Sequence, residues 1–430
     1  MLNLTQVVLR LGEFDCPVIH FSYPQGVNMP YYKSVLICIL LSLFSQVSFA
    51  YTDVPESASE TIKAEIYSLK EKYIPDSRLN FFSFKTDGSL YSIETTSKEL
   101  YNSLLNLAKL YPREKVSIRL LPDESKSPSK WRALVKFSTI QIQTGPDFAS
   151  EWSTQALMGT PVRILKPAQG YWALIQNYDG YVGYTTVGNL QPLTEDEYLY
   201  WLAATRVIYL ENHGFIYSRP DLDSPTISDL VAGNVLVWVN QESANSFRRV
   251  QTPDGHCGWV LEKETQEWND WVSSRDLTAD NLISSARRLM GVPYIWGGTS
   301  SKGVDCSGLV NFAFMQNGYN ILRDVSQIQR EGVEVDLSQG WENFQPGDLL
   351  IFGKRETNGK THWRHVGIYL GDGRFIHSAT YVHESSLDPL SPDYDEGNAK
   401  ELIKVIRMIN APHTPYFHPI SENEAFQNAF

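Results

Sequence analysis

The sequence of 430 residues has only four cysteines, and none of them stands in a Cys-x-x-Cys pair. A structural zinc site of the common kind uses such pairs, so this class of site is not expected. Basic residues are also scarce, because 37 lysines and arginines stand against 49 acidic residues and leave a net charge of −12. A chain this acidic lacks the basic surface of a nucleic-acid-binding protein, so no nucleic-acid partner is expected.

Long hydrophobic runs are missing too, apart from residues 35–47. That run follows Lys33 and precedes Ser48-Phe49-Ala50, the pattern of a secretory signal peptide, and it is too short to cross a membrane. A buried core helix is the alternative. Because Met29 stands where a signal would begin, we interpret residues 1–28 as a mis-assigned upstream start and 29–50 as the signal peptide. The protein is then periplasmic or extracellular, with no permanent membrane anchor.

The rest of the chain is too long for one ordinary core, so several domains are expected. Residues 51–125 have mostly helical character. Thr96-Ser97-Lys98-Glu99 matches a capping box, and leucines follow it at helical spacing. We predict a small helical N-terminal domain, which ends in a linker rich in proline, serine and lysine.

Two later segments repeat one pattern of short strands and turns. Residues 157–184 contain a strand, a connection, a second strand, an Asp-Gly turn and a third strand, and residues 230–259 contain the same order. This rhythm is typical of a small barrel. We predict two barrels, at residues 126–195 and 196–276, and their pattern resembles bacterial SH3-like domains, which commonly bind or flank cell-wall peptides.

The last domain, residues 277–412, begins with helices and continues with strands, and a polar tail follows at 413–430. Thr278 or Asp280 can cap its first helix. Strands are expected at 346–352, 365–370 and 374–379, with a fourth candidate at 402–409. Helices followed by an antiparallel sheet predict an α+β fold. The predicted protein is therefore multidomain: a helical piece, two barrels and an α+β domain.

The chemistry of the last domain centres on Cys306, which stands at a predicted helix start in Gly303-Val304-Asp305-Cys306-Ser307-Gly308. Unpaired backbone N–H groups and the helix dipole there favour the reactive thiolate. A cysteine nucleophile needs a base and a group that orients the base. His365 opens one strand and His377 lies in the next, so we predict His365 as the base and His377 as the orienting residue.

Other interpretations of these residues stay open. Cys306 could be inert packing, His362 could compete with His365, and Cys306, His365 and His377 could together bind a metal ion, although a thiolate at a helix start needs none. Cys257 is the other cysteine after the signal, and a reactive Cys306 requires that the two do not form a disulfide. No metal and no cofactor are predicted.

Residues 280–410 resemble the NlpC-type family of papain-like cell-wall cysteine peptidases. The resemblance rests on five motifs in order: Pro293-Tyr294-Ile295-Trp296-Gly297-Gly298, Asp305-Cys306-Ser307-Gly308, Pro346-Gly347-Asp348-Leu349, His365-Val366-Gly367-Ile368-Tyr369 and Ile376-His377. It implies a nucleophile, a base and an orienting residue at Cys306, His365 and His377. It also implies that Tyr294 lines the site and helps to stabilise the oxyanion.

The predicted architecture resembles the subgroup that cleaves the γ-D-glutamyl–diamino acid bond of muropeptides with a free N-terminal L-alanine. In that subgroup a glutamate and a tyrosine of the first barrel meet the amino end of the peptide, and Glu151 and Tyr184 are the best matches. Asp305, Ser307 and Asp324 match positions that contact the peptide. Val325 and the polar loop at 357–364 depart from the pattern, so the rim of the cleft is expected to differ.

The resemblance implies hydrolysis of peptidoglycan stem peptides in cell-wall turnover or recycling, by a monomer. Two alternatives remain open at this stage. The chain could be a cell-wall-binding module with a degenerate peptidase lobe, or it could use the same three residues as an amidase or acyltransferase.

Overall fold

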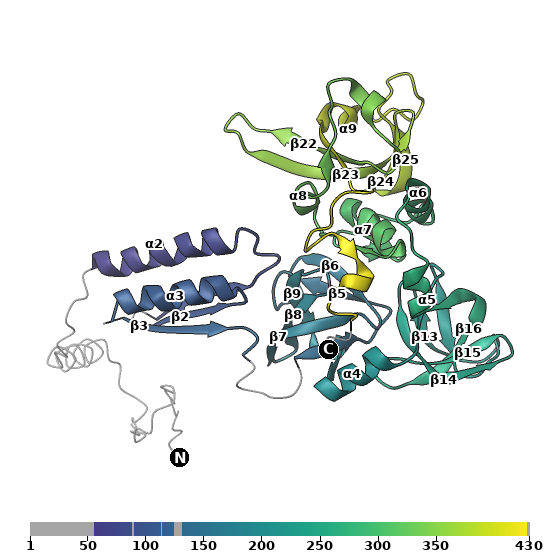
Figure 1. Cartoon of the computed structure of the whole chain (residues 1–430), viewed down its shortest axis with the longest axis horizontal. Helices are drawn as coiled ribbons and strands as arrows, with labels where there is room; N and C mark the ends of the chain where they lie inside the picture. The colour runs from purple at the N-terminus through teal and green to yellow at the C-terminus, as the bar shows by residue number, and fades with distance from the viewer. Residues whose placement is uncertain (1–55, 88–89, 113, 124–130, 428–430) are drawn as a thin grey trace, which may run out of the picture. The chain divides into compact units, whose positions relative to one another are not determined.

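The computed structural model describes residues 56–87, 90–112, 114–123 and 131–427 (Figure 1). The predicted upstream start and signal peptide, residues 1–50, lie outside the described residues. The chain divides into two compact units, residues 1–65 and 66–430. Helix α2 (Glu56–Tyr73) begins in the first unit and ends in the second. In the described ranges no helix has both the length and the apolar character needed to cross a membrane.

The segment before the barrels is not purely helical, which corrects the prediction for residues 51–125. A three-stranded sheet accompanies the helices, with β1 antiparallel to β2 and β2 parallel to β3. The strands alternate between more and less buried residues along β2 and β3, a period of two that the helical interpretation overlooked. Ser97, in the predicted capping box, accepts a hydrogen bond from Leu100 N at 3.1 Å and begins α3. The elements are β1 (Phe82–Thr86), β2 (Leu90–Thr95), α3 (Lys98–Leu110) and β3 (Lys115–Leu120).

A seven-stranded antiparallel sheet, here the first β-domain, occupies residues 131–193, where the first barrel was predicted. Its strand order is β10-β4-β7-β8-β9-β5-β6, and alternating inward residues from these strands form its core. The elements are β4 (Arg132–Val135), β5 (Thr139–Gln143), β6 (Trp152–Leu157), β7 (Pro161–Gln169), β8 (Trp172–Asn177), β9 (Val182–Thr186), η1 (Val187–Asn189) and β10 (Leu190–Leu193).

A second seven-stranded antiparallel sheet, the second β-domain, occupies residues 206–267, in the order β13-β12-β16-β15-β14-β11-β17. Helices α4 (Glu195–Ala203) and α5 (Trp268–Ser273) flank it in sequence. Its elements are β11 (Arg206–Tyr209), β12 (Gly214–Tyr217), β13 (Thr226–Leu230), β14 (Val235–Ala244), β15 (Phe247–Gln251), β16 (Cys257–Leu261), η2 (Glu262–Glu264) and β17 (Thr265–Glu267).

The C-terminal domain contains the predicted helices followed by a six-stranded antiparallel sheet in the order β21-β26-β22-β23-β24-β25. Thr278 caps the first helix by accepting from Asn281 N at 3.2 Å. The elements are α6 (Ala279–Arg287), β18 (Thr299–Ser300), β19 (Gly303–Val304), α7 (Cys306–Gln316), β20 (Tyr319–Asn320), α8 (Val325–Ile328), β21 (Val333–Glu334), η3 (Gly340–Asn343), β22 (Leu349–Arg355), β23 (Thr361–Gly371), β24 (Arg374–Ala379), β25 (Tyr381–Ser386), α9 (Glu396–Glu401), β26 (Leu402–Arg407), β27 (His418–Pro419) and η4 (Ile420–Glu422).

Helix α7 packs against β23 and β24 of this sheet, and α6 packs against α7 (Figure 1). Helix α7 is buried on nearly all sides: Leu309, Val310 and Phe312 are each at most 1% exposed. They share one apolar core with Val366 and Ile376 of the strands. This burial holds the first residue of α7, Cys306, against the strands that carry the two histidines.

Residues 361–364 of the predicted polar loop belong to a strand and only the residues before them form a turn, because β22 and β23 continue their ladder as far as the pair Arg355 and Thr361. A tight turn closes this hairpin, with Glu356 N donating to Lys360 O at 2.7 Å and Gly359 at a φ of +85°. His362 therefore lies in β23 and is exposed.

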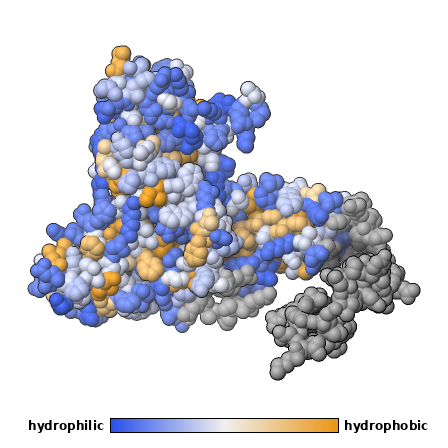
Figure 2. All heavy atoms as spheres, turned by 180° about the vertical axis from the view of Figure 1, so that it is seen from behind, coloured by the Kyte–Doolittle hydropathy of each residue, from blue (hydrophilic) through white to orange (hydrophobic). Residues whose placement is uncertain are grey.

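The polar tail docks onto the folded chain through a few apolar groups. Phe417 is 1% exposed, β27 pairs with β20, and Phe426 stacks on Trp268 with ring centroids 5.1 Å apart. On the face drawn in Figure 2, hydrophilic residues predominate and the apolar ones form separate patches, in keeping with the acidic composition.

Candidate active site

Cys306 is the first residue of α7, and Asp305 is the N-cap of that helix. The Asp305 carboxylate accepts hydrogen bonds from Gly308 N at 2.7 Å and from Gly297 N at 2.9 Å. These bonds satisfy donors of the helix end and of the preceding glycine turn, so they hold that turn against the helix start. The helix thus begins where the sequence predicted, within one residue.

The protonation state of Cys306 differs from the prediction. The pKa of its thiol is raised to about 12, chiefly by burial and also by the nearby charge of Asp305, while Arg323 and the backbone N–H groups of Ser307 and Val366 act in the opposite direction. The helix start favours the thiolate, but loss of hydration outweighs it, since the side chain is only 7% exposed. The resting site therefore holds a neutral thiol. Cys306 and Cys257 are both free, which agrees with the requirement that they do not pair.

His365 and His377 meet on adjacent strands β23 and β24. His365 Nε2 lies 2.7 Å from His377 Nδ1, and His377 Nε2 lies 3.1 Å from Ser385 Oγ on β25. Gly367 makes room for this pairing, because a Cβ there would lie 2.8 Å from the Phe375 ring and 3.4 Å from His377 Cβ. This is the hydrogen bond that the predicted orienting role of His377 requires.

The hydrogen-bond chain defines which nitrogen of His365 can act as a base. In a neutral imidazole ring, one nitrogen carries a proton and donates a hydrogen bond, and the other nitrogen accepts one. If His365 donates from Nε2, His377 accepts at Nδ1 and donates from Nε2 to Ser385 Oγ. His365 then carries its lone pair on Nδ1, the only nitrogen left for a proton from Cys306. Ser385 completes the orientation, and the sequence interpretation missed it.

Both rings are neutral at physiological pH. Burial lowers the pKa of His365 to about 3, and the charge of Arg364 and the neighbouring His383 act in the same direction. Burial likewise lowers the pKa of His377 to about 3, with His365 and His383 adding to the effect. Cys306 and His365 are thus neutral partners, and an ion pair between them forms only when the proton moves.

A pH dependence of stability follows from these lowered values. Below pH 6.5 the unfolded chain binds protons on both histidines, whereas the folded chain does not until the pH approaches 3. The free energy of unfolding is therefore expected to fall as the pH drops below 6.5. Between pH 6 and 5, each histidine contributes a slope of about 1 kcal/mol per pH unit.

Urea denaturation at closely spaced pH values measures this slope. His377→Gln removes one titrating ring and keeps a hydrogen-bonding side chain, so its slope is expected to be smaller than the wild-type slope by about 1 kcal/mol per pH unit. Equal slopes in the two proteins would show that His377 protonates in the folded state.

Arg323 is, after Ser385, a second residue at the site that the sequence interpretation passed over. Its guanidinium is 1% exposed and forms a bidentate pair with Asp305, with Nη2 donating to Oδ2 at 2.6 Å and Nη1 to Oδ1 at 3.1 Å. Nη1 also donates to Ser307 Oγ at 2.8 Å. A buried arginine needs such partners, and the apolar neighbours Ile321 and Leu322 were the signal that it is buried. Asp305 and Ser307, predicted to contact the peptide, are thus engaged with Arg323.

The first β-domain reaches this network through β6. Arg323 Nε donates to Thr154 Oγ1 at 3.0 Å. Gln155 Oε1 accepts from Thr299 N at 2.9 Å and from Ser300 Oγ at 3.0 Å. The chain turns sharply at Gly297, at a φ of +76°, where a Cβ would lie 2.8 Å from the carbonyl oxygen of Trp152. Strand β6 therefore contacts and stabilises both the start of α7 and the glycine turn that precedes it.

Two of the predicted site residues, Tyr294 and Glu151, lie close in sequence to the glycine turn or to β6. Tyr294 is half-buried, and burial raises its pKa, with the charges of Cys306 and Asp305 adding to the effect. Its hydroxyl therefore stays protonated and can donate a hydrogen bond near the thiol. Glu151 is exposed and directly precedes Trp152, the residue that touches Gly297. Residue 151 thus lies next in sequence to the part of β6 that contacts the glycine turn.

The structure places Tyr184 elsewhere. It packs against the buried cluster that contains Leu165 and Leu174, and its pKa is raised by burial and by the charge of Glu94. The tyrosine hydroxyl of the first β-domain that donates to Asp324 belongs to Tyr181, and it lies 3.2 Å from Asp324 Oδ2. The Asp-Gly turn at residues 179–180 precedes β9, so Tyr181 leaves the sheet in a direction that motif order could not predict.

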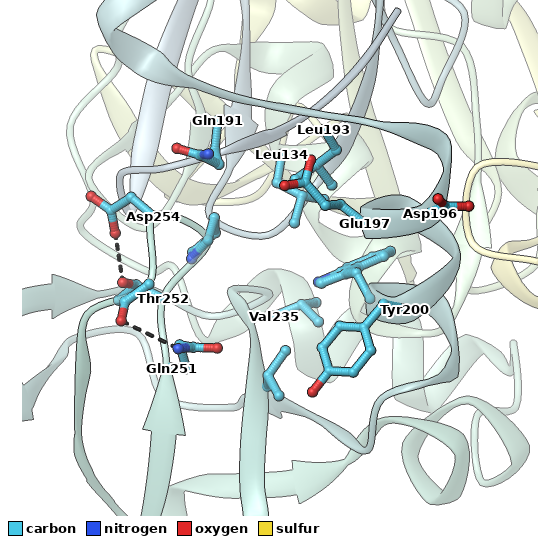
Figure 3. A pocket seen from close by; sticks show the side chains of 14 residues that line it. Leu134, Gln191, Leu193, Asp196, Glu197, Tyr200, Val235, Gln251, Thr252 and Asp254 are labelled. Carbon is cyan, nitrogen blue, oxygen red and sulfur yellow. Dashed lines mark hydrogen bonds between the residues drawn. The ribbon is translucent and has the colours of Figure 1, made fainter. Parts of the chain in front are cut away.

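The cavity that the structure forms between the two β-domains is separate from the candidate active site. A cavity of about 440 Å³ opens between the two β-domains and α4, with Leu134 and Val235 in its wall and Tyr200 and Asp254 at its edge (Figure 3). Cys306, His365 and His377 do not line it. Within the described part of the chain, no group of three or more His, Cys, Asp or Glu side chains is arranged to hold a metal ion.

Family models match two parts of the chain. Residues 291–404 match the NlpC/P60 family, and residues 142–190 match the bacterial dipeptidyl-peptidase SH3 domain. The first match includes the cysteine, both histidines and Tyr294. The second covers the first β-domain from the end of β5 to the start of β10, including β6.

Curated relatives and solved structures agree with these matches. The chain is 29% identical over 257 residues to a gamma-D-glutamyl-L-lysine dipeptidyl-peptidase of Bacillus cereus, covering 58% of this chain and 74% of that protein. It is 25% identical over 285 residues to dipeptidyl-peptidase 6 of Lysinibacillus sphaericus, covering 64% and 98%. A crystal structure of an NlpC/P60 family protein from Bacillus cereus shares the fold, with a TM-score of 0.55 and 23% identity over 65% of this chain and 99% of that one. The chain therefore carries a bacterial dipeptidyl-peptidase SH3 domain and, at its C-terminal end, a domain of the NlpC/P60 family of peptidases.

Proposed function

We propose that this protein is a cysteine endopeptidase that hydrolyses the γ-D-glutamyl–diamino acid bond of peptidoglycan-derived peptides with a free N-terminal L-alanine. The observation that carries the proposal is the chain of contacts behind Cys306. The thiol is buried at a helix start beside β23, and the base on that strand is held by His377 and Ser385. The names of the two dipeptidyl-peptidase relatives support the choice of substrate.

The proposed reaction begins from the neutral pair. His365 Nδ1 takes the proton of Cys306, and the sulfur attacks the γ-carbonyl carbon of D-glutamate. The backbone N–H of Cys306 and the hydroxyl of Tyr294 donate hydrogen bonds to the oxyanion. His365 then gives its proton to the departing amine, and water hydrolyses the thioester, which releases L-Ala-D-Glu and restores the thiol.

Neutral partners suit this reaction. The thiolate forms only as it attacks, so its buried charge passes directly to an oxyanion that two donors stabilise. The imidazolium of His365 donates a hydrogen bond from its Nε2 to His377 Nδ1, with the two nitrogens 2.7 Å apart. This bond holds the His365 ring while its own Nδ1 takes up and releases a proton.

Three further expectations belong to the proposal. We propose that residues 29–50 direct export, that the second β-domain is also SH3-like, and that the enzyme acts as a monomer. Expression with and without residues 29–50, followed by fractionation and sizing of the exported chain, tests the first and third. The second is tested by a structure of residues 196–276 compared with SH3 domains.

The decisive experiment incubates the protein with L-Ala-γ-D-Glu-diaminopimelate and identifies products by mass spectrometry. Release of L-Ala-D-Glu and the free diamino acid is expected. Binding without cleavage would favour a cell-wall-binding module, and transfer to an added amine or cleavage of a different amide would favour an acyltransferase or amidase. Cleavage of stems still attached to glycan at the same rate as the free tripeptide would contradict selection for a free amino end.

We expect Glu151→Gln to weaken that selection. A carboxylate that accepts a hydrogen bond from an ammonium contributes about 1.5–3 kcal/mol, so its loss lowers the ratio of kcat/KM for free over N-acetylated tripeptide at least tenfold. The matched control is Glu195→Gln, another exposed glutamate, which should leave the ratio unchanged. An unchanged ratio in Glu151→Gln would remove Glu151 from substrate recognition.

A further inference from the structure

Residues 74–81, which join α2 to β1, enter the neighbourhood of the candidate site from outside the two matched regions. The loop carries two charged residues, Asp76 and Arg78. Asp76 is 8% exposed, and the Arg78 side chain is 30% exposed. A charged pair buried to this degree needs partners, and its partners lie in the C-terminal domain.

Arg78 bridges two carboxylates with its planar fork of donors. Its Nε and Nη2 donate to the two oxygens of Asp76 at 2.8 and 2.7 Å. Its Nη1 donates to Asp324 Oδ2 at 2.9 Å and to Ser326 Oγ at 2.9 Å. The guanidinium therefore cannot rotate without breaking bonds at both ends.

Other segments brace this bridge from two sides. Gln327 Nε2 donates to Asp76 Oδ2 at 3.0 Å, which ties the loop to α8. The carbonyl of Arg78 accepts from Val182 N at 2.7 Å, next to Tyr181, whose hydroxyl also donates to Asp324 Oδ2. Two separate parts of the chain, the loop with Arg78 and the turn with Tyr181, thus donate to one oxygen of Asp324.

We infer that Arg78 is a positioning residue that holds Asp324 for recognition of the peptide's free amino end. The inference rests on the proposed function and deepens it, because it gives residues before the first β-domain a role in specificity. Asp76, Arg78 and Asp324 together carry one net negative charge. The ammonium of an unblocked peptide neutralises that charge, whereas an N-acylated peptide leaves it uncompensated.

Geometry and charge act in opposite directions when Arg78 is removed. Loss of its positive charge would by itself favour an ammonium, but water and salt screen that gain, because the side chains of Arg78 and Asp324 are 30% and 27% exposed. Loss of its hydrogen bonds frees the Asp324 carboxylate from the bridge and weakens recognition. A lysine at this position keeps the charge and cannot reproduce the fork, so it separates the two effects.

The test compares Arg78→Ala and Arg78→Lys with wild type in the full chain, using the free and the N-acetylated tripeptide. KM for the free tripeptide is expected to rise about tenfold in Arg78→Ala and at least threefold in Arg78→Lys, with kcat within a factor of two. KM for the acetylated peptide should change less. The control Ser326→Ala removes only the second acceptor of Nη1 and should keep KM within a factor of two.

Two results would overturn the inference. Wild-type KM in Arg78→Lys would show that charge alone matters, and equal losses on both peptides, together with a lower melting temperature, would show a purely structural role. If the wild-type protein does not cleave the tripeptide, the proposed function fails. Arg78 is then judged by calorimetric binding of the tripeptide to Cys306→Ala with and without Arg78→Lys: weaker binding supports its role, and equal or absent binding rejects it.

Discussion

Cys306→Ala is expected to lower kcat/KM for the tripeptide by a factor of about 10⁴ or more, because the thioester cannot form without the sulfur. The remaining groups, Tyr294, His365 and the backbone donors, can still bind and polarise the peptide, so binding should persist. The fold should persist as well, since alanine fills most of the volume of a cysteine that is buried at a helix start. Release of L-Ala-D-Glu, followed by mass spectrometry, is the measurement.

Cys257 provides the matched control within the same chain. It is a free, exposed cysteine at the start of β16 in the second β-domain. Cys257→Ala should retain wild-type kcat/KM, which separates loss of the nucleophile from loss of any thiol. Residual activity of Cys306→Ala above about a tenth of wild type would contradict the nucleophile assignment, because removing a catalytic nucleophile costs far more than that.

Arg323→Met is expected to lower the free energy of unfolding by about 3–5 kcal/mol, because it leaves the Asp305 carboxylate buried without its ion-pair partner. Asp305 keeps its bonds from Gly308 N and Gly297 N, so part of its charge remains stabilised. Activity should fall too, since the same carboxylate anchors the helix start that presents Cys306. Urea denaturation and kcat/KM are measured together.

A double variant separates the unpaired charge from lost packing. Asp305→Asn with Arg323→Met removes both charges and keeps an N-cap residue, so it should recover at least half of the lost stability. Arg249→Met is the surface control, because Arg249 pairs with Glu242 where both side chains are about 40% exposed, and no measurable change is expected. A loss in Arg323→Met as small as in this control would show that the pair contributes nothing to folding.

Local patterns were enough to predict the elements of the C-terminal domain. Thr278, a predicted cap of the first helix, begins α6, and the predicted strands at residues 365–370 and 374–379 lie in β23 and β24. These features depend on neighbours a few residues apart, which a sequence displays directly. The strands at residues 82–120 were missed because a short alternating run beside a strong helical pattern is ambiguous without its partner strands.

Long-range packing determined the features of the site that the sequence could not reveal. A carboxylate, an arginine and a threonine at positions 305, 323 and 154 meet only after the first β-domain has docked. In the same way, Tyr181 rather than Tyr184 reaches Asp324, because the direction of a side chain at a turn depends on how its sheet packs. The bridge from Arg78 to Asp324 spans 246 positions in sequence, which no spacing rule covers.

The sequence by itself determined which groups can react. A cysteine at a helix start and two histidines on a tight hairpin follow from residue types and local spacing. Only the tertiary structure decided their protonation states. The free energy of a charged side chain depends on its burial, and the segments that bury these residues lie far away in the chain. At Cys306 that burial outweighs the helix start and leaves a neutral thiol beside a neutral imidazole. Because Nε2 of His365 is engaged in the hydrogen-bond chain with His377 and Ser385, Nδ1 is the nitrogen of His365 that can take the proton of Cys306.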